Sequence, residues 1–142
     1  MTSVSIRAAT TGDSAALANL ISQLDYEAGA DDVAERLALM KAEGRVVLVA
    51  ERDGAVVGCL STSVMRVLHR PAPVGRISMM VVDAGSRNRG IGAQLVRAAE
   101  DALRAQGCYM TEVTSNMRRA DAHRFYERLG YEKTSVRLMR ML

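Results

Sequence analysis

The sequence has no tryptophan, one phenylalanine and four tyrosines. Single-stranded nucleic acids are bound largely by stacking bases on aromatic side chains, so this chain offers few such platforms and we expect no nucleic-acid partner. Its two cysteines, Cys59 and Cys108, are too few and too far apart for a disulfide scaffold. We interpret them as small buried apolar residues, which favours a reducing compartment.

Long apolar runs and clustered metal ligands are also absent. No run approaches the roughly 20 residues that a membrane-spanning helix needs, and the N-terminus lacks the layout of a signal peptide. We therefore expect a cytoplasmic protein without a membrane partner. His69 has no neighbouring side chains that would complete a ligand set, so the sequence predicts no metal site.

The composition is that of an ordinary globular chain. Its 142 residues suit a single domain over 1–142, and 49% hydrophobic with 25% charged residues is a normal balance. The formal net charge is +3, and the arginines are scattered rather than clustered. A small anionic ligand would explain this excess of positive charge as well as a nucleic acid would.

Hydrophobic periodicity predicts elements in the order β-α-α-β-β-β-α-β-α-β-β. The predicted strands are 4–7, 46–50, 55–68, 77–82 and 110–115, with one or two more in 131–141, and the predicted helices are 10–24, 31–42, 93–106 and 121–129. Asp53-Gly54, between two apolar runs, is a strong hairpin signal. The order indicates an α+β (mixed α/β) domain with one central sheet covered by helices.

A glycine-rich turn follows the apolar strand 77–82 and leads into a predicted helix. Gly90 and Gly92 have no Cβ, so a ligand can approach the backbone closely. Free N–H groups at a helix start attract anions, whereas Arg87 and Arg89 would oppose the helix dipole unless an anion lay there. The pattern favours a phosphate-bearing ligand; an ordinary tight turn is the alternative.

Two motifs resemble those of the GNAT superfamily of N-acetyltransferases. Residues 82–93, VDAGSRNRGIGA, are similar to its acetyl-CoA signature, and 125–131, FYERLGY, resemble its tyrosine helix that ends in glycine and an aromatic residue. The element order fits over nearly the whole chain. Residues 110–116 and 121–126 closely resemble aminoalkylphosphonate N-acetyltransferases, whereas the first 75 residues match much less well.

The resemblance implies a mostly antiparallel sheet whose strands 77–82 and 110–115 splay apart to admit the thioester of acetyl-CoA, the co-substrate. It places the pyrophosphate on main-chain amides of 87–93 and the pantetheine beside the backbone of 80–82. The cofactor-binding residues that it implies are Met80, Val81, Val82, Arg87, Asn88, Arg89, Gly90, Ile91, Gly92, Ala93, Asn116 and Arg119.

Tyr126 is the predicted general acid, because a phenol with a pKa of about 10 can protonate a departing thiolate whose thiol has a pKa of about 8.5. A core aromatic residue is the alternative. The general base is open: many superfamily members carry a glutamate where this chain has Ser78-Met79-Met80. Glu112 acting through water, His123, or bulk solvent would take the proton of the amine. The structural alternatives are that Glu112 is an ion-paired carboxylate and that His123 lies on the surface of its helix.

Arg66, His69 and Arg70 form a basic cluster that could clamp a phosphonate or carboxylate on the acceptor, with solvated loop charges as the alternative. We expect acetyl transfer by direct attack of the primary amine of a small anionic acceptor. A protein N-terminal or lysine acetyltransferase and a non-catalytic acyl-CoA-binding module are the competing functions. Since edge strands in such domains often pair, a homodimer is a further expectation.

Overall fold

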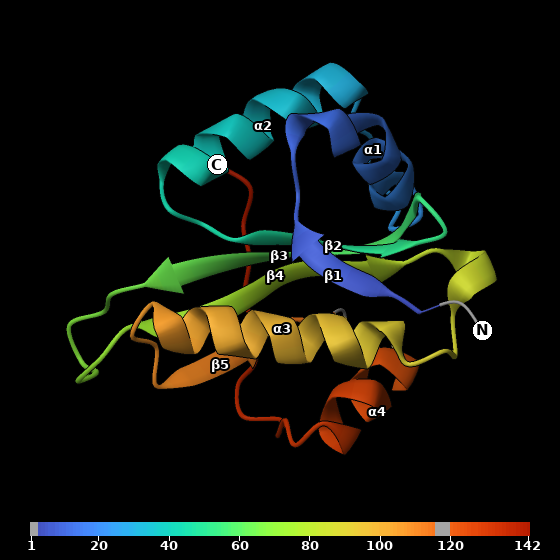
Figure 1. Ribbon diagram of the computed structural model, residues 1–142. Helices are drawn as coiled ribbons and strands as arrows, with labels where there is room; N and C mark the ends of the chain where they lie inside the picture. Colours follow the sequence, from blue (N-terminus) through green and yellow to red (C-terminus); the bar gives the residue numbers. More distant parts are fainter. Residues whose placement is uncertain (1–2, 116–119) are drawn as a thin grey trace.

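A central sheet separates two helical layers in the computed structural model, which describes residues 3–115 and 120–142 (Figure 1). The elements in chain order are β1 (Ser5–Ala8), η1 (Thr11–Asp13), α1 (Ser14–Ser22), α2 (Ala30–Ala42), β2 (Val47–Arg52), β3 (Ala55–Met65), β4 (Val74–Val82), η2 (Ala84–Ser86), α3 (Ile91–Ala105), β5 (Met110–Val113) and α4 (Ala120–Arg128). Helices α1 and α2 cover one face, and α3 and α4 cover the other (Figure 1). Within the described ranges, no helix is long and apolar enough to cross a bilayer, and no cluster of at least three His, Cys, Asp or Glu side chains could hold a metal.

The sheet has the strand order β1-β2-β3-β4-β5, and every neighbouring pair is antiparallel except β4 and β5. The predicted hairpin joins β2 to β3, with Arg52 opposite Ala55. Asp53 and Gly54 both have positive φ, 54° and 77°, which is the backbone of a type I′ turn. The predicted α+β class with a mostly antiparallel sheet is confirmed.

Strand β2 shows why its apolar run is continuous instead of alternating. Val47 and Val49 join the core beneath α1 and α2. Leu48 and Ala50 point to the opposite face and join the core beneath α3. A strand that is buried on both faces needs apolar residues at every position.

Helix α3 packs closely against the sheet at two glycines. Its Leu95 and Leu103 are fully buried. A Cβ at Gly75 would lie 2.8 Å from Leu103 Cδ1, and one at Gly58 would lie 3.2 Å from Leu95 Cδ1. The absence of side chains at these two sheet positions lets the helix settle onto β3 and β4, which fixes where its N-terminus points.

The sheet opens between β4 and β5. The parallel pairing runs from Val74 opposite Met110 to Ile77 opposite Val113. Strand β5 ends there, whereas β4 continues to Val82 with β3 alone as its described neighbour. The predicted splaying of these two strands is therefore confirmed.

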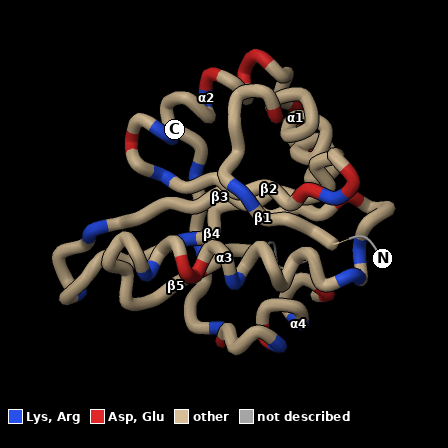
Figure 2. The backbone as a smooth tube through the Cα atoms, in the orientation of Figure 1, with Lys and Arg blue, Asp and Glu red and all other residues tan. Residues whose placement is uncertain are grey.

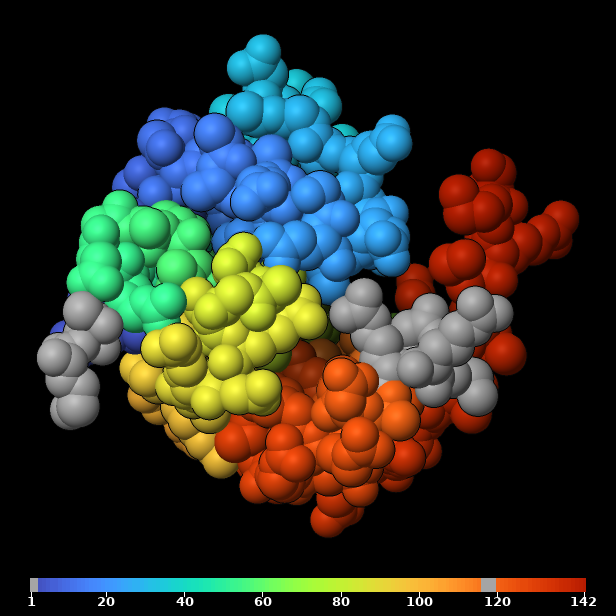
Figure 3. Space-filling model, turned by 90° about the vertical axis from the view of Figure 1, so that its right-hand side faces the viewer, coloured from blue at the N-terminus to red at the C-terminus, as the bar shows by residue number. Residues whose placement is uncertain are grey.

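The final strands predicted in 131–141 are wrong. Residues 131–142 have no regular secondary structure, and everything from 132 onward is exposed. A strand requires hydrogen bonds to a neighbouring strand, and no such pairing of 132–142 occurs among the described residues. Figure 3 shows this red C-terminal segment projecting from the body.

An ion pair ties β1 to the start of the first helical layer. Arg7 Nη1 and Nη2 donate to the two carboxylate oxygens of Asp13, at 2.8 and 2.9 Å, and Arg7 Nε donates to Glu51 at 2.9 Å. Asp13 is buried. Its hydrogen bonds with the Arg7 guanidinium lower the pKa of the Asp13 carboxyl to about 2.

This lowered pKa predicts an acid-sensitive contribution to stability. A carboxyl whose pKa is depressed by folding stabilises the folded state above its unfolded pKa of about 3.9, by about 2 kcal/mol here. The contribution is lost as the pH falls from about 4 to about 2. Asp13→Asn should therefore lower the free energy of unfolding at pH 7, and its difference from the wild type should shrink towards pH 2, as measured by urea unfolding. Asp53→Asn, in an exposed turn, is the control; an unchanged stability of Asp13→Asn at pH 7 would contradict the assignment.

Candidate active site

A cleft of about 1160 Å³ opens where β4 and β5 diverge. Its walls come from the α1–α2 loop, the second half of β4, the turn before α3, the end of β5, and α4. Figure 3 looks onto this end of the molecule, where the blue, yellow and orange segments meet. The cleft therefore borders both helical layers.

The turn between β4 and α3 is held in place by side chains from distant elements. The Asp83 carboxylate accepts a hydrogen bond from Gly85 N at 3.1 Å and another from Gln23 Nε2 of the segment after α1 at 2.9 Å. Arg52 Nη2 of β2 donates to Ser86 Oγ at 3.0 Å. These contacts fix the backbone that leads into α3.

The first amides of α3 face the cleft without a helical acceptor. Gly90, with φ of 75°, is the N-cap, and Asn88 is also left-handed with φ of 64°. The helical hydrogen bonds begin with Gln94 N donating to Gly90 O at 3.1 Å. No described side chain caps this end and the first turn has no acidic residue, so the amides of 91–93 are available to an anion. Arginines flank the turn (Figure 2).

Gly92 lies where α3, α4 and β4 come together. A Cβ at this position would lie 3.1 Å from Phe125 Cζ and 3.6 Å from Met80 Cε. Both of these neighbours line the cleft. A side chain at 92 would therefore displace Phe125 or Met80 and change the lining of the cleft.

The backbone of β4 offers hydrogen-bonding groups to the gap. Asp83 N donates to Val57 O at 2.8 Å, and Val82 lies opposite Gly58. In an antiparallel ladder the groups of alternate residues point away from the partner strand, so those of Met80 and Val82 point towards the side where β5 has diverged. Arg87 Nε donates to the Val82 carbonyl at 3.1 Å. The Val82 N–H is then the group of this residue that can donate to a ligand in the gap.

Tyr126 is the buried aromatic residue of α4 that lines the cleft. Its ring makes edge contacts with Phe125 and Tyr131, with centroids 5.0 and 5.6 Å apart. Tyr131 is held in turn by Glu100, which accepts from its hydroxyl at 2.8 Å, and by Thr111 at 3.0 Å. Burial raises the pKa of Tyr126 to about 12, so its phenol stays protonated across the neutral range.

Most of the predicted cofactor residues lie along this cleft. Those that line it are Met80, Val81, Val82, Arg87, Asn88, Gly90, Ile91, Gly92 and Ala93, and Tyr126 of α4 lines it as well. Arg89 is exposed on the same turn and is not part of the lining. Asn116 and Arg119 lie outside the described residues.

The two predicted base candidates are not part of the cleft lining. Glu112 on β5 forms an ion pair with Arg76 on β4 at 2.9 Å. His123 is half-buried on α4. Their catalytic roles stay predictions.

Charged side chains that were not expected from the sequence also line the cleft: the carboxylates Asp25, Glu27 and Asp121, and the cation Arg36 on α2. The first two belong to the acid-rich stretch 25–32 between the first two helices, which was the available signal. Asp25 also has a positive φ of 65°, which marks a tight turn.

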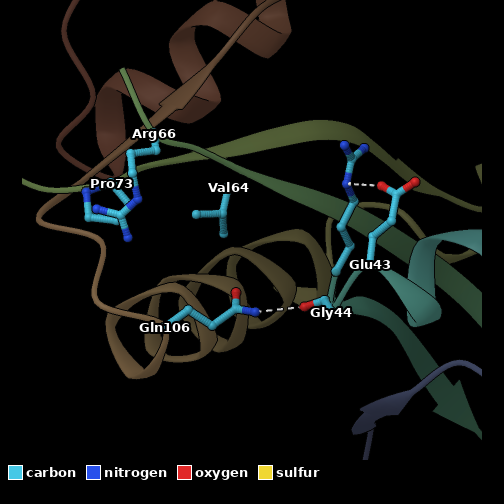
Figure 4. A pocket seen from close by; sticks show the side chains of 7 residues that line it. Glu43, Gly44, Val64, Arg66, Pro73 and Gln106 are labelled. Carbon is cyan, nitrogen blue, oxygen red and sulfur yellow. Dashed lines mark hydrogen bonds and ion pairs between the residues drawn. The ribbon is translucent and has the colours of Figure 1, made fainter. Parts of the chain in front are cut away.

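The basic cluster of Arg66, His69 and Arg70 lies elsewhere. Arg66 lines a separate cavity of about 430 Å³, together with Val64, Pro73 and Gln106 (Figure 4). Arg70 Nη1 donates to the Tyr109 hydroxyl at 3.0 Å, and His69 is exposed. None of the three lines the large cleft, so an acceptor clamp at these residues stays a prediction.

Comparison with known proteins decides the family. The family model for the acetyltransferase (GNAT) family matches residues 15–131. The chain belongs to the GNAT acetyltransferase family. It is 37% identical over 142 residues to the aminoalkylphosphonate N-acetyltransferase of Salmonella typhimurium, covering 96% of this chain and 90% of that protein. It is 32% identical to the aminoglycoside N(6')-acetyltransferase type 1 of Stenotrophomonas maltophilia, over 91% of this chain and 86% of that one.

Among solved structures, an aminoglycoside N-acetyltransferase in complex with CoA has the same fold, with a TM-score of 0.89, 18% identity, and coverage of 100% of this chain and 96% of that one. As a GNAT member with these relatives, the chain is an acetyl-CoA-dependent N-acetyltransferase that acts on an amine acceptor. Acetyl-CoA is its co-substrate.

The close packing at Gly92 predicts a loss of coenzyme binding. Gly92→Val should push Phe125 and Met80 into the cleft that they line, and so raise the Kd for acetyl-CoA at least about 10-fold, equivalent to about 1.4 kcal/mol. Isothermal titration calorimetry measures it. Gly12→Ala, whose added Cβ would make only an ordinary 3.5 Å contact far from the cleft, is the matched control. Unchanged affinity in a folded Gly92→Val variant would contradict the placement of the coenzyme.

Proposed function

We propose that this acetyltransferase acts on the primary amine of a small acceptor that also carries an anionic group, such as an aminoalkylphosphonate or an amino acid. The observation that supports this substrate class is the charge of the cleft wall formed by α2 and the α1–α2 loop. Arg36 lies there together with Asp25 and Glu27. A molecule with an ammonium at one end and a phosphonate or carboxylate at the other complements both the two carboxylates and the arginine.

The names of two relatives point to two kinds of amine acceptor. The Salmonella typhimurium relative acts on aminoalkylphosphonates, and the Stenotrophomonas maltophilia relative acts on aminoglycosides. Aminoglycosides carry several amines and no anionic group, so they would use the carboxylates and leave Arg36 without a partner. The presence of Arg36 in the lining therefore favours the anionic acceptor.

The residues at the opposite wall fit the coenzyme. The free amides of 91–93 would hold its diphosphate, and the outward N–H of Val82 would bond the pantetheine arm, as in an added strand. Acetyl-CoA supplies the acetyl group as a thioester. Because Gly92 has no side chain, the start of the helix packs directly against Phe125 and Met80, two of the residues that line the cleft.

Tyr126 holds the proton that the departing sulfur needs. Its phenol lines the cleft and stays protonated because burial raises its pKa to about 12. The same poorly solvated surroundings disfavour a thiolate, so the proton transfer stays feasible although Tyr126 is a weaker acid than an exposed tyrosine. Its ring contacts with Phe125 and Tyr131 fix its orientation.

The acceptor must lose its ammonium proton before it attacks. Glu112 is engaged by Arg76 and lies outside the lining of the cleft. Asp25 and Glu27 border the cleft, so in this proposal they attract the ammonium and pass its proton to solvent. Direct attack by the neutral amine follows.

A matched pair of acceptors tests the substrate class. An aminoalkylphosphonate and the alkylamine of equal length without the phosphonate should differ in kcat/KM by roughly 10- to 100-fold, since a charge-assisted hydrogen bond contributes about 1.5–3 kcal/mol. Release of CoA thiol, followed with a chromogenic disulfide, measures both rates. Arg36→Gln should remove most of this preference by raising KM for the phosphonate while leaving the Kd for acetyl-CoA unchanged.

Arg66→Gln is the control, because it removes a cation that lies in the separate cavity. Loss of the preference in Arg66→Gln instead of Arg36→Gln would support the acceptor clamp at 66–70 and contradict the role of Arg36. Turnover of peptides alone would establish a protein acetyltransferase. Tight acetyl-CoA binding without thiol release from a panel that also includes aminoglycosides and peptides would establish a binding module.

The role of Tyr126 predicts a loss of turnover without a loss of binding. Tyr126→Phe removes the hydroxyl and keeps the ring contacts, so kcat should fall about 100-fold while the Kd for acetyl-CoA changes little. Steady-state kinetics and calorimetry measure the two quantities. Tyr109→Phe, which removes an exposed hydroxyl bonded to Arg70, is the control. An unaltered kcat in Tyr126→Phe would contradict its role as the acid.

A further inference from the structure

Helix α4 ends in a backbone cap that joins Tyr131 to Tyr126. Gly130 follows the helix with φ of 97°, a left-handed conformation that glycine adopts at little cost. Tyr131 N donates to Tyr126 O at 3.0 Å, and Gly130 N donates to Glu127 O at 3.0 Å. These two bonds form a Schellman motif, in which the residues joined by the longer bond often touch through their side chains. Here the Tyr131 and Tyr126 rings make that contact, with centroids 5.6 Å apart.

The hydroxyl end of Tyr131 is held by two other elements. It donates to Glu100 Oε2 on α3 at 2.8 Å. The Thr111 hydroxyl on β5 lies 3.0 Å from the same phenol oxygen, and since a phenol has one proton, the threonine donates this second bond. Burial raises the pKa of Tyr131 to about 12, so the phenol keeps its proton across the neutral range. The Tyr131 hydroxyl therefore joins α3 and β5 to the end of α4.

Glu100 is buried and engages both of its carboxylate oxygens. Its second oxygen accepts from Arg97 Nη1 at 2.7 Å. Arg97 Nη2 in turn donates to Leu129 O, just after α4, at 3.1 Å. A buried carboxylate is costly without such partners. Helix α3 therefore holds the end of α4, which lies on the same face of the sheet, through both the carboxylate and the arginine (Figure 1).

Within the described part of the chain, the side chains that hold Tyr131 lie outside the lining of the cleft: Arg97, Glu100 and Thr111. Tyr131 lies outside the lining as well, whereas Tyr126 belongs to it. An effect of this anchor on turnover must therefore pass through another residue. Tyr126 is the cleft residue that Tyr131 contacts through both its backbone and its ring.

We propose that Tyr131 is a positioning residue for the general acid: its hydroxyl, held by Glu100 and Thr111, sets where Tyr126 presents its phenol in the cleft. The inference rests on the proposed function, because that function makes Tyr126 the acid. Proton transfer needs the phenol within hydrogen-bond reach of the departing sulfur, and a small misplacement lowers the rate steeply. The anchor ties the acid to α3, the helix whose first amides would hold the coenzyme.

Tyr131→Phe tests this role, since it removes the hydroxyl and keeps both the ring contact and the backbone bond. We expect kcat to fall about 10-fold while the Kd for acetyl-CoA changes less than about 2-fold. Release of CoA thiol with the fastest acceptor in a panel of aminoalkylphosphonates, aminoglycosides and peptides measures kcat, and calorimetry measures Kd. Tyr109→Phe, which removes an exposed hydroxyl, is the matched control. A folded Tyr131→Phe variant with the kcat of the wild type would overturn the inference.

A double-mutant cycle separates positioning from a general loss of structure. In Tyr126→Phe the hydroxyl to be positioned is gone, so adding Tyr131→Phe should lower kcat no further. If Tyr131 supported only the fold or the shape of the cleft, its effect would appear in full in that background, which would overturn the inference. A Tyr126→Phe variant with the kcat of the wild type would instead contradict the proposed acid. A loss in Tyr131→Phe would then act through another residue, and the positioning role would fall with the acid.

Variants of Glu100 give a second route that leaves Tyr131 intact. Glu100→Gln keeps an oxygen that can accept from the Tyr131 hydroxyl, so its kcat should stay within about 3-fold of the wild type. Glu100→Leu has a similar size and no acceptor, so its kcat should fall about 10-fold. Asp101→Asn, which alters an exposed ion pair with Arg104 on the same helix, is the control. Circular dichroism checks the fold, and equal kcat in the two Glu100 variants would overturn the role of this hydrogen bond.

Discussion

The uncapped N-terminus of α3 is the constraint on which the rest of the site depends. Within the described part of the chain no side chain caps the amides of 91–93, and unpaired buried N–H groups are costly unless water or a ligand takes their hydrogen. The turn in front of them is nevertheless held in place, because Gln23 just after α1 and Arg52 at the end of β2 form hydrogen bonds with it. A turn that is fixed in this way presents its donors without further ordering when a ligand arrives, which lowers the entropic cost of binding.

Because β4 and β5 diverge, the anion site at the start of α3 lies beside an open cleft. Glycines at sheet positions 58 and 75 let α3 approach closely, and the helix start then lies beside the open half of β4. Helix α4 brings Tyr126 to the same opening and holds its ring between Phe125 and Tyr131. The opposite layer, α1 and α2, contributes charged groups of both signs. In our proposal the coenzyme is therefore held by α3 and the acceptor by the α1–α2 side.

The local sequence predicts the structure correctly where interactions between residues close in the chain determine it. The Asp53-Gly54 turn, the amphipathic α3 and the glycine-rich turn before it follow from backbone freedom and periodicity within a few residues. The lining by Asp25, Glu27 and Arg36 does not, because it depends on how α1 and α2 dock onto the sheet. Likewise, the pairing of Glu112 with Arg76 depends on the register of β5 against β4. The pattern in 131–141 predicts strand, but a strand needs a neighbouring strand, and the described residues provide none there.

The most direct measurement of the central claim is amide NMR of the ¹⁵N-labelled protein. Titration with CoA should shift the resonances of Ile91, Gly92 and Ala93 strongly downfield, as N–H groups do when they donate to a phosphate. Pantetheine, which has the same arm but no diphosphate, should leave these three resonances nearly unchanged while it perturbs Val82. Binding of CoA that leaves the amides at the start of α3 unshifted would contradict the account.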